Sequence, residues 1–437
     1  MIQDMSYPRN RPGILSINAQ INSDEFPTAW GSFDSTAALI LSLPPGCLAA
    51  TFDIAAAYRI TPIAPHQQNS MCVFWEGKIY IDRVLMFGLA SSAGVFGSVA
   101  DMLVAIYEKA GFGPIRKWVD DFFVILMPGD TWTEEEFIRL TGELGVPWHR
   151  TKTRPLAAVQ RFIGFDWDLP RCTVALPLEK LAKIQALIKS WMSTGFTSTA
   201  TEAASLHGKL VYISCIFPLI RPFIRSSAAF AESFVSTRAH LIPPPSVNAD
   251  LSWIRFLLTN LPNEQPLASP AAVDIQWWGD ASTSFGIGIA IGHFWAVWKW
   301  APGFKVGAGP NFKFDIGWAE AVAVELGLRI AISYGLLASR SPACSKFLVR
   351  SDNTGIVAVT NSGRSRSKTT NEILKHVYLL QARQGIRIHA EYVSTRINIS
   401  DALSRGDVDA FLKGFPAVTT QATIALPTHL ADKLVAW

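Results

Sequence analysis

At 437 residues the chain is longer than one hydrophobic core usually organises, so roughly two to four domains are expected. Hydrophobic residues make up 49% and charged residues 17%, a balance that excludes a disordered polymer and predicts large buried cores. The net charge of +4 is compatible with a polyanionic partner but does not require one.

Membrane insertion, secretion and a disulfide framework are not expected. The longest charge-free runs, such as 84–100, contain Gly and Ser and are shorter than the ~20 apolar residues that span a bilayer. The amino terminus lacks the apolar segment and cleavage site of a signal peptide. The sequence contains no CxxC motif, so a zinc knuckle is not indicated. The five cysteines are expected to be reduced and buried: Cys47, Cys72, Cys172, Cys215 and Cys344.

The amino-terminal part, from residue 48 to 168, alternates short apolar runs with turn signals. The sharpest pattern is Ile115 to Met127, where apolar stretches flank Asp120 and Asp121 and predict a strand, an acidic turn and a strand. Asp53 closes another apolar segment, so one sheet can bring the three aspartates together. Such clustered carboxylates can hold two Mg²⁺ ions about 4 Å apart for phosphoryl transfer, whereas a lone Asp pair is usually a solvated turn.

The middle of the chain is expected to be a small helical module. Apolar residues recur at helical spacing from Leu178, and Thr199 with Glu202 predicts a capping box for a second helix that runs toward Ile213. Pro218 and Pro222 are expected to end the helical pattern. Three consecutive prolines make 240–248 the best candidate for an interdomain linker.

A second pattern of strands and helices follows in the order βββαβαβ. Gly335 and Gly385 stand where its two helices should end. A short helix near Asp401 closes the pattern, and the residues after it show only a weak helical signal. The expected ranges are Val273–Trp278, Gly286–Ile291, Phe294–Lys299, Trp318–Tyr334, Lys346–Arg350, Asn371–Gln384 and Arg387–Val393.

Two other groups have alternative interpretations. The basic residues Arg364, Arg366 and Lys368 can contact a phosphate backbone or lie in a solvated loop. Five tryptophans can stack on bases, but on alternating strands they more often belong to the core: Trp277, Trp278, Trp295, Trp298 and Trp300.

Several segments of the amino-terminal half resemble motifs of reverse transcriptases. FDIAAAY (52–58) is similar to the first palm motif, and WVDD (118–121) is similar to YxDD with Trp118 in place of Tyr. FGLASSAGVF (87–96) resembles the loop and helix that pack against the incoming base, and RFIGF (161–165) resembles the primer-grip hairpin.

This resemblance implies roles for individual residues. Asp53 and Asp120 would bind the metals and Asp121 would assist. Tyr58 would exclude a ribose 2′-hydroxyl, Phe87 would pack in the nucleotide site, and Lys152 would protonate the pyrophosphate. A core tyrosine, tight helix packing and a solvated lysine are the corresponding structural alternatives.

The amino terminus departs from the family pattern. IQDMSYPRN (2–10) resembles the end of the fingers motif, whose triphosphate-binding basic residues would lie upstream. The resemblance therefore implies a chain truncated within the fingers, with Arg9 and Arg11 as partial substitutes. It leaves the polymerase activity of this chain open.

Four acids in the carboxy-terminal part resemble the metal site of ribonuclease H: Asp280, Glu320, Asp352 and Asp401. They follow strands or begin helices, and two-metal hydrolysis of RNA is the implied chemistry. Glu325 competes with Glu320, but a separation of five residues turns the two by about 140° on a helix, so both cannot face one site. Glu320 fits the family pattern better, although a solvated helix acid is its structural alternative. Asp315 lies before the helix and is expected to be a loop or capping acid.

The implied fold is α+β and multi-domain: partial fingers and palm (1–170), a helical thumb and connection (171–262), an α/β ribonuclease H-like domain (272–408) and a tail (409–437). The implied activity is RNA-directed DNA polymerase with ribonuclease H, as in retroelement (retrotransposon) polyproteins, those of the tyrosine-recombinase (DIRS-like) type included. The alternative is a truncated or degenerate fragment that binds nucleic acid or retains only the ribonuclease H activity.

The same resemblance implies the cofactors, partners and location. Each active site would take two Mg²⁺ ions, with Mn²⁺ as a substitute. The partners would be an RNA template, a DNA primer, an RNA:DNA hybrid and dNTPs, without a membrane and with no implied oligomeric state. The location would be the cytoplasm or the nucleus.

Overall fold

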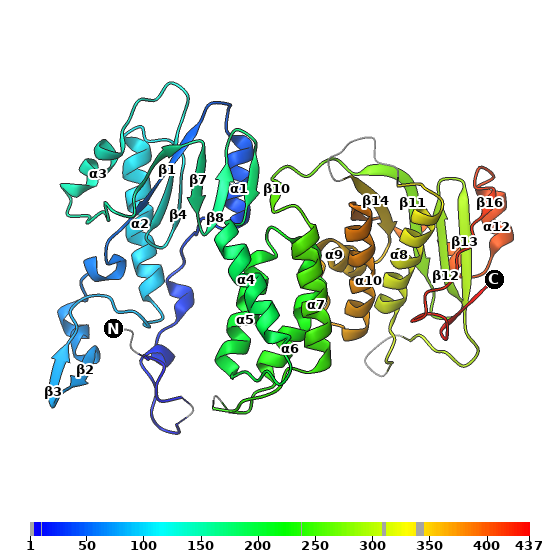
Figure 1. The fold of residues 1–437 in the computed structure, drawn as a ribbon, viewed down its shortest axis with the longest axis horizontal. Helices are drawn as coiled ribbons and strands as arrows, with labels where there is room; N and C mark the ends of the chain where they lie inside the picture. Colours follow the sequence, from blue (N-terminus) through cyan, green and yellow to red (C-terminus); the bar gives the residue numbers. More distant parts are fainter. Residues whose placement is uncertain (1–3, 10, 237, 308–311, 338–344) are drawn as a thin grey trace. The chain divides into compact units, whose positions relative to one another are not determined.

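The computed structural model describes residues 4–9, 11–236, 238–307, 312–337 and 345–437. The chain divides into two compact units of mixed helices and strands (Figure 1). The first contains Met1–Pro177 and Glu264–Ala268, and the second contains Leu178–Asn263 and Ser269–Trp437.

A four-stranded sheet organises the first unit, in the order β4-β5-β1-β6. The expected strand, acidic turn and strand are confirmed, because β4 and β5 form an antiparallel pair around Asp120. The bounds are β1 Leu48–Asp53, β4 Ile115–Trp118, β5 Asp121–Leu126 and β6 Arg154–Ala157.

Aromatic packing fixes helices α2 (Ser92–Lys109) and α3 (Glu134–Gly142) against one face of this sheet. Phe137 of α3 stacks on Phe52 of β1 with ring centroids 3.9 Å apart and on Tyr107 of α2 at 3.7 Å. Such aromatic pairs bury large apolar side chains against each other. The ends of β1 and β5, which carry the aspartates, are therefore held by a rigid core.

A second small sheet has the order β10-β9-β8-β7, and Phe162 of β7 stacks on Phe123 of β5 at 5.1 Å. The expected hairpin at 161–165 is present: Ile163 and Gly164 form a two-residue turn with φ of 44° and 81°. The remaining bounds of the first unit are α1 Phe33–Ser42, β2 Cys72–Trp75, β3 Lys78–Ile81, β7 Val159–Phe162, β8 Phe165–Asp168, β9 Thr173–Ala175, β10 Glu264–Pro266, and 3₁₀-helices Asn18–Gln20, Ser23–Glu25, Ala57–Ile60 and Pro65–Ser70.

The second unit begins with the expected helices. The capping box is confirmed, since Thr199 Oγ1 accepts from the Glu202 amide at 3.3 Å and the Glu202 carboxylate accepts from the Thr199 amide at 2.8 Å. The prediction that Pro218 and Pro222 end the helical pattern is wrong, because both lie in a 3₁₀-helix that leads into α6. The bounds are α4 Leu178–Trp191, α5 Ala200–Ile213, the 3₁₀-helix Pro218–Ile224, and α6 Arg225–Glu232.

The predicted linker at 240–248 is also wrong. Helix α7 (Pro245–Asn260) begins at the third proline of the run. Proline is favoured at the first helical position because it has no amide hydrogen to leave unbonded there. The proline run is therefore a helix start inside the second unit.

A larger sheet carries the rest of the second unit, in the order β15-β14-β11-β12-β13-β16, with β17 also pairing β13. Strands β11, β12 and β13 are antiparallel, whereas β14 lies parallel to both β11 and β15. The three expected amino-terminal strands are confirmed. The bounds are β11 Val273–Ala281, β12 Gly286–Ile291, β13 Phe294–Trp300, β14 Lys346–Ser351, β15 Arg387–Tyr392, β16 Thr420–Gln421 and β17 Leu434–Ala436.

Residues of β12 point alternately to the two faces of this sheet. Ile287 and Ile289 join the core beneath α8, whereas Ala290 packs with Leu403 and Phe411 on the other face. Gly288 lies so close to α11 that a Cβ atom there would be 2.4 Å from the Ser404 amide. The glycine thus lets α11 approach the sheet. The helices are α8 Ile316–Ser333, α9 Thr354–Ser362, α10 Lys368–Gln384, α11 Asp401–Ser404 and α12 Val408–Gly414.

Two features of this unit correct the expected order βββαβαβ. Helix α9 lies between β14 and α10 and was not expected. The weak helical signal after Asp401 holds for α12, but β16 and β17 then extend the sheet along β13. Gly335 and Gly385 both have positive φ next to the helix ends, as expected.

Within the part of the chain that the structure describes, no helix is long and apolar enough to cross a bilayer. The four described cysteines are free thiols. Only Cys47 is buried, so the expected burial is wrong for Cys72, which is exposed, and for Cys172 and Cys215, which are half-buried. Cys344 lies outside the described residues.

Candidate functional site

The first carboxylate set lies at the ends of two paired strands. Asp53, the last residue of β1, is the register partner of Asp121, the first residue of β5. The Ile54 amide donates to the Asp120 carbonyl at 3.0 Å, which ties the end of β1 to the β4–β5 turn. The structure therefore brings Asp53, Asp120 and Asp121 to one edge of the sheet.

The turn that carries Asp120 is strained. Val119 has a φ of 55°, a left-handed conformation that is costly for a β-branched residue. Trp118, just before it, is 43% exposed. A strained backbone next to an exposed ring and an aspartate pair is typical of functional sites.

Mutual repulsion makes this set a site for positive charge. Burial and then the charges of Asp120 and Asp53 raise the pKa of Asp121 to about 6. Burial and the charge of Asp53 also raise the pKa of Asp120. Lys152 donates a 2.8 Å hydrogen bond to Asp53 and offsets part of the charge, and this bond raises the pKa of the lysine.

An aromatic group adjoins the first set. The Tyr58 ring lies 5.0 Å from Phe87 and 5.6 Å from Phe96, measured between centroids. Burial, and then the negative charge of Asp120, raises the pKa of Tyr58. Tyr58 is therefore near Asp120, and its neighbour Phe87 is 41% exposed.

The second carboxylate set is more closely gathered. Asp280 lies in β11, Glu320 in the second turn of α8, and Asp352 directly after β14. One oxygen from each of these three lies within 4.8 Å of the others. Among the described residues, the aspartates of the first set do not meet this distance. The structural alternative, in which Glu320 is a solvated helix acid, is wrong, because Glu320 is 4% exposed.

The protonation of this set follows from its burial. Burial and then the charges of Asp352 and Asp401 raise the pKa of Asp280 to about 7, although the Ser404 hydroxyl partly opposes the shift. Burial and the charges of Asp280 and Asp352 raise the pKa of Glu320 well above its usual range. A divalent cation would relieve this repulsion, and hard carboxylate oxygens are the ligands that Mg²⁺ prefers. The donor set therefore fits Mg²⁺.

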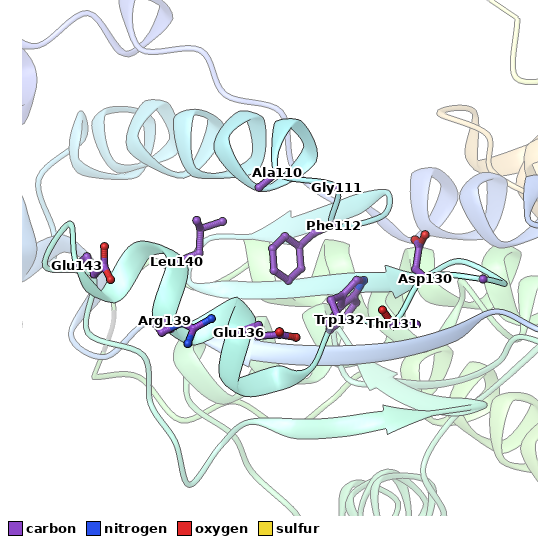
Figure 2. A pocket seen from close by; sticks show the side chains of 11 residues that line it. Ala110, Gly111, Phe112, Asp130, Thr131, Trp132, Glu136, Arg139, Leu140 and Glu143 are labelled. Carbon is purple, nitrogen blue, oxygen red and sulfur yellow. The ribbon is translucent and has the colours of Figure 1, made fainter.

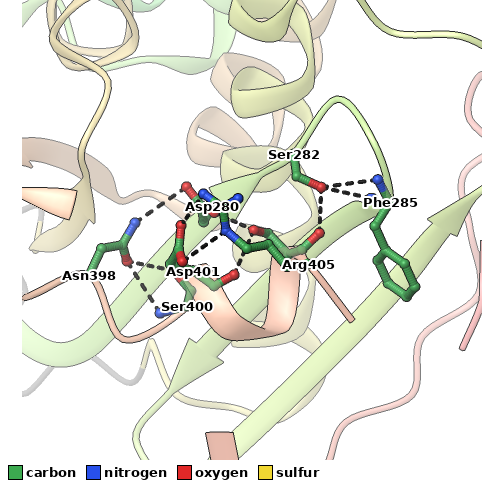
Figure 3. A network of polar contacts seen from close by, with 9 residues as sticks. Asp280, Ser282, Phe285, Asn398, Ser400, Asp401 and Arg405 are labelled. Atoms are coloured by element: carbon green, nitrogen blue, oxygen red, sulfur yellow. Dashed lines mark hydrogen bonds and ion pairs between the residues drawn. The ribbon is translucent and has the colours of Figure 1, made fainter. Parts of the chain in front are cut away.

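Asp401 is not one of the three carboxylates that lie within 4.8 Å of one another. Figure 3 shows it beside Asp280 and Arg405. Arg405 Nε and Nη2 each donate to an oxygen of Asp401 at 2.9 Å, so both carboxylate oxygens are engaged. Its charge nevertheless contributes to the raised pKa of Asp280.

Sequence reasoning assigned no role to two residues that hold Asp280. The Ser404 hydroxyl donates to Asp280 Oδ2, and Asn398 Nδ2 donates to Asp280 Oδ1 at 3.4 Å. Both side chains are buried, and Asn398 is held in turn by Ser400, whose amide and hydroxyl donate to its oxygen (Figure 3). The motif NISDALSR contains all three residues, so the signal was present in the sequence.

The remaining expectations have mixed outcomes. Asp315 caps α8 as expected, with its carboxylate accepting from the Trp318 amide at 2.8 Å. Glu325 does not face the second set and is fully buried elsewhere.

Trp277, Trp295 and Trp298 are buried, as the core interpretation expects. The other two expected tryptophans, Trp278 and Trp300, are half-buried, and the basic residues Arg364, Arg366 and Lys368 are exposed.

A pocket of about 590 Å³ lies in the first unit, between the end of α2, the loop after β5 and helix α3 (Figure 2). Phe112, Trp132 and Leu140 line it together with charged groups such as Glu136 and Arg139. None of its lining residues belongs to either carboxylate set, so the pocket is a separate feature.

No family model and no curated protein matches the chain. Solved structures of the foamy viral protease-reverse transcriptase are weakly similar to it. One in complex with RNA/DNA hybrid has a TM-score of 0.42 and 16% identity, and covers 84% of this chain and 46% of that chain. A second structure, the foamy viral protease-reverse transcriptase dRH in complex with ds DNA, has a TM-score of 0.41 and 16% identity. The match covers 84% of this chain and 61% of that chain. One in complex with dsDNA has a TM-score of 0.38 and 18% identity, with 84% and 72% covered. The chain therefore spans less than two thirds of the length of the first two structures.

Proposed function

We propose that this chain hydrolyses the RNA strand of RNA:DNA hybrids at Asp280, Glu320, Asp352 and Asp401. The supporting observation is the convergence of three carboxylates, from β11, α8 and the end of β14, within 4.8 Å of one another. Buried acids with raised pKa values reduce the stability of a fold at neutral pH, and such groups cluster at catalytic sites. The resemblance of the four acids to the ribonuclease H motifs supplies the substrate class.

The proposed cofactor is a pair of Mg²⁺ ions held by these carboxylates. When bound, the ions would supply the Lewis acid that lowers the pKa of the attacking water and stabilises the leaving 3′-oxygen. The chain itself positions the ligands: Ser404 and Asn398 fix the two oxygens of Asp280. Arg405 donates to both oxygens of Asp401 and orients this carboxylate at the edge of the site.

A second activity, extension of a DNA primer on an RNA template with dNTPs, is proposed for the first set. The supporting observation is that Asp53 and Asp121 are register partners on a rigid sheet, beside Asp120, with Lys152 bonded to Asp53. In this proposal Lys152 gives a proton to the leaving pyrophosphate, and Tyr58 with Phe87 contacts the nucleotide sugar and base. The assignment to a retroelement of the tyrosine-recombinase type is part of the same proposal.

The test is one labelled RNA:DNA substrate with a recessed DNA primer, on which both cleavage and extension are followed in Mg²⁺. We expect Asp280→Asn to slow cleavage by about 100-fold or more and to leave extension intact, because it removes one ligand of the second set. We expect Asp120→Asn to do the reverse. Asp409→Asn and Asp34→Asn are matched controls, since both residues are exposed and outside either set.

Each outcome separates the proposals. Cleavage that survives Asp280→Asn would contradict the first, and extension that survives Asp120→Asn would contradict the second. Cleavage without extension would indicate a chain that is active only as a nuclease. Hybrid binding without either activity would overturn both proposals and favour a nucleic-acid-binding fragment.

A further inference from the structure

Three arginines of the second unit gather where the loop between α9 and α10 meets the end of α5, the 3₁₀-helix after it and the start of α6. Arg221 Nε donates to the Ser214 carbonyl at 3.3 Å, and Arg364 Nη2 donates to the hydroxyl of the same serine at 3.4 Å. Arg225 Nη1 donates at 2.9 Å to the carbonyl of Ser365, the residue next to Arg364. The three guanidinium groups therefore surround one loop and form an arginine cluster.

The loop that carries Arg364 is held in place by the core. Gly363, with a φ of 70°, ends α9, and a Cβ atom there would lie 2.8 Å from the Tyr378 ring. The side chain of Asn371, buried in α10, donates to the Pro222 carbonyl at 2.8 Å. These contacts fix the α9–α10 loop against the 3₁₀-helix, so the position of the cluster is set by the fold.

The positive charge of the cluster is not neutralised by a nearby acid. Lys375 of α10 pairs with Asp250 and Glu372 at 2.8 and 2.9 Å. Among the described residues, no carboxylate forms an ion pair of this kind with any of the three arginines. Burial and then the charge of Arg364 lower the pKa of His207, as an uncompensated positive charge should.

The cluster has hydrogen-bond donors left for an anion. In the part of the chain that the structure describes, each guanidinium uses one of its five N–H groups in a hydrogen bond. The planar guanidinium matches the spacing of phosphate oxygens and binds them through two parallel hydrogen bonds. Like charges that gather without a counterion create a positive potential that attracts a polyanion.

Helix α9 sets the distance between the cluster and the second carboxylate set. The helix begins two residues after Asp352 and ends two residues before Arg364. Its nine residues span about 14 Å at 1.5 Å per residue. Phosphates along one strand of a duplex follow each other at about 3.4 Å, so this length corresponds to about four base pairs. One duplex can therefore contact both places.

We propose that Arg221, Arg225 and Arg364 bind backbone phosphates of an RNA:DNA hybrid. The hybrid is the substrate of the proposed hydrolysis, so this inference rests on that proposed function. Arg366 and Lys368 are exposed on the same loop and extend the positive surface. Contacts to phosphates hold a duplex in position without reading its sequence.

The experiment measures binding of a fluorescently labelled RNA:DNA hybrid to the full chain by anisotropy, in EDTA and at about 50 to 200 mM KCl. Without Mg²⁺ the binding is measured apart from cleavage. Arg225→Gln and Arg364→Gln should each weaken binding by about 3-fold or more at low salt. Each should also reduce the slope of log K against log salt by about 0.9, because it removes one phosphate contact. Glutamine keeps an N–H donor for the Ser365 carbonyl or the Ser214 hydroxyl.

Two further variants separate charge at this place from charge in general. Arg364→Lys keeps the positive charge and should keep most of the slope. Arg383→Gln is the matched control, because Arg383 lies in the last turn of α10, at the far end of that helix from the loop. It should bind the hybrid like the unaltered chain. Circular dichroism melting should show that all four variants are folded.

Each outcome decides between the proposals. An unchanged slope in Arg225→Gln and Arg364→Gln, or an equal loss in Arg383→Gln or Arg364→Lys, would overturn the arginine cluster as a phosphate site. Arginine-dependent binding by a chain that does not cleave the hybrid in Mg²⁺ would support the cluster and contradict the proposed hydrolysis. Cleavage of a hybrid whose binding is independent of the three arginines would do the reverse.

Discussion

Lys152 and Asp53 stand 99 positions apart in the sequence, and the lysine ammonium donates a 2.8 Å hydrogen bond to that carboxylate. The Lys152 side chain is 56% exposed, whereas the Asp53 side chain is 10% exposed. One exposed positive charge thus lies beside the sheet edge that carries Asp53, Asp120 and Asp121. This hydrogen bond raises the pKa of Lys152, and in the proposed extension reaction the lysine would lie close to the leaving pyrophosphate.

Lys152→Met should slow primer extension by about 10-fold or more, because it removes the proposed proton donor. The effect should appear in single-turnover rates rather than in primer–template affinity. Lys109→Met, at an exposed position of α2, is the control and should extend at the unaltered rate. Equal rates for both variants would argue that Lys152 is only a solvated lysine.

Asp280 should make the stability of the metal-free chain depend on pH. Burial and neighbouring charges raise its pKa from 3.8 to about 7, so the folded chain binds this proton more tightly than the unfolded chain does. Stability in EDTA should therefore fall as the pH rises between these two values. Asp280→Asn should raise the free energy of unfolding by about 1–3 kcal/mol at pH 8 and by little at pH 4. Urea denaturation at both values measures this, and an equal effect at both would contradict it.

Ser404 should tune the same carboxyl group. Its hydroxyl donates to Asp280 and lowers the pKa of that group. Ser404→Ala should therefore shift the rising limb of the cleavage–pH profile to higher pH by about 1 unit, with a larger loss at pH 6.5 than at pH 8.5. Ser333→Ala, exposed at the end of α8, should leave the profile in place. A loss that is uniform across pH would indicate a structural role only.

Arg405 should compete with metal ions for Asp401. Both oxygens of Asp401 accept hydrogen bonds from the guanidinium, so the positive charge of Arg405 opposes the binding of a metal ion to this carboxylate. Arg405→Gln should therefore lower the Mg²⁺ concentration that half-saturates cleavage, by about 3-fold or more. Asp401→Asn should raise it. If both variants changed the half-saturating Mg²⁺ concentration in the same direction, this competition would be contradicted.

Tyr58 should discriminate between nucleotide sugars. Its ring packs against Phe87 and Phe96 beside Asp120, where a 2′-hydroxyl would meet it in the proposed nucleotide site. Tyr58→Val should increase incorporation of rNTPs relative to dNTPs by about 10-fold or more, because it removes the ring. Tyr58→Phe keeps the ring and should preserve the selection, and an equal loss in both variants would assign the effect to the hydroxyl.

Local signals in the sequence predicted much of the fold. Strand alternation, the Thr199–Glu202 capping box and the glycines at 335 and 385 act within a few residues, and the elements they predicted are present. Helix α9 was missed because it is short, begins with Thr354 and Gly355, and contains β-branched residues that favour strands. The prolines at 243–245 were mistaken for a linker because the same residues also begin helices.

The parts that depend on distant pairing could not be predicted from the sequence. Strands β16 and β17 have two and three residues, and they exist only because β13 offers its edge. The carboxylates of both sets could be named from their motifs, but the grouping of Arg221 and Arg225 with Arg364 has no motif spacing. That grouping arises from tertiary packing alone.

Strand β10 belongs to the first unit but is synthesised only after the helices of the second unit. Until Glu264–Pro266 is synthesised, β9 presents an open edge, because its pairing on that side is to β10. At a translation rate of about 5–20 residues per second, the intervening helices delay that strand by several seconds. An unpaired edge invites association with other chains, so nascent molecules should be most prone to aggregate during this interval.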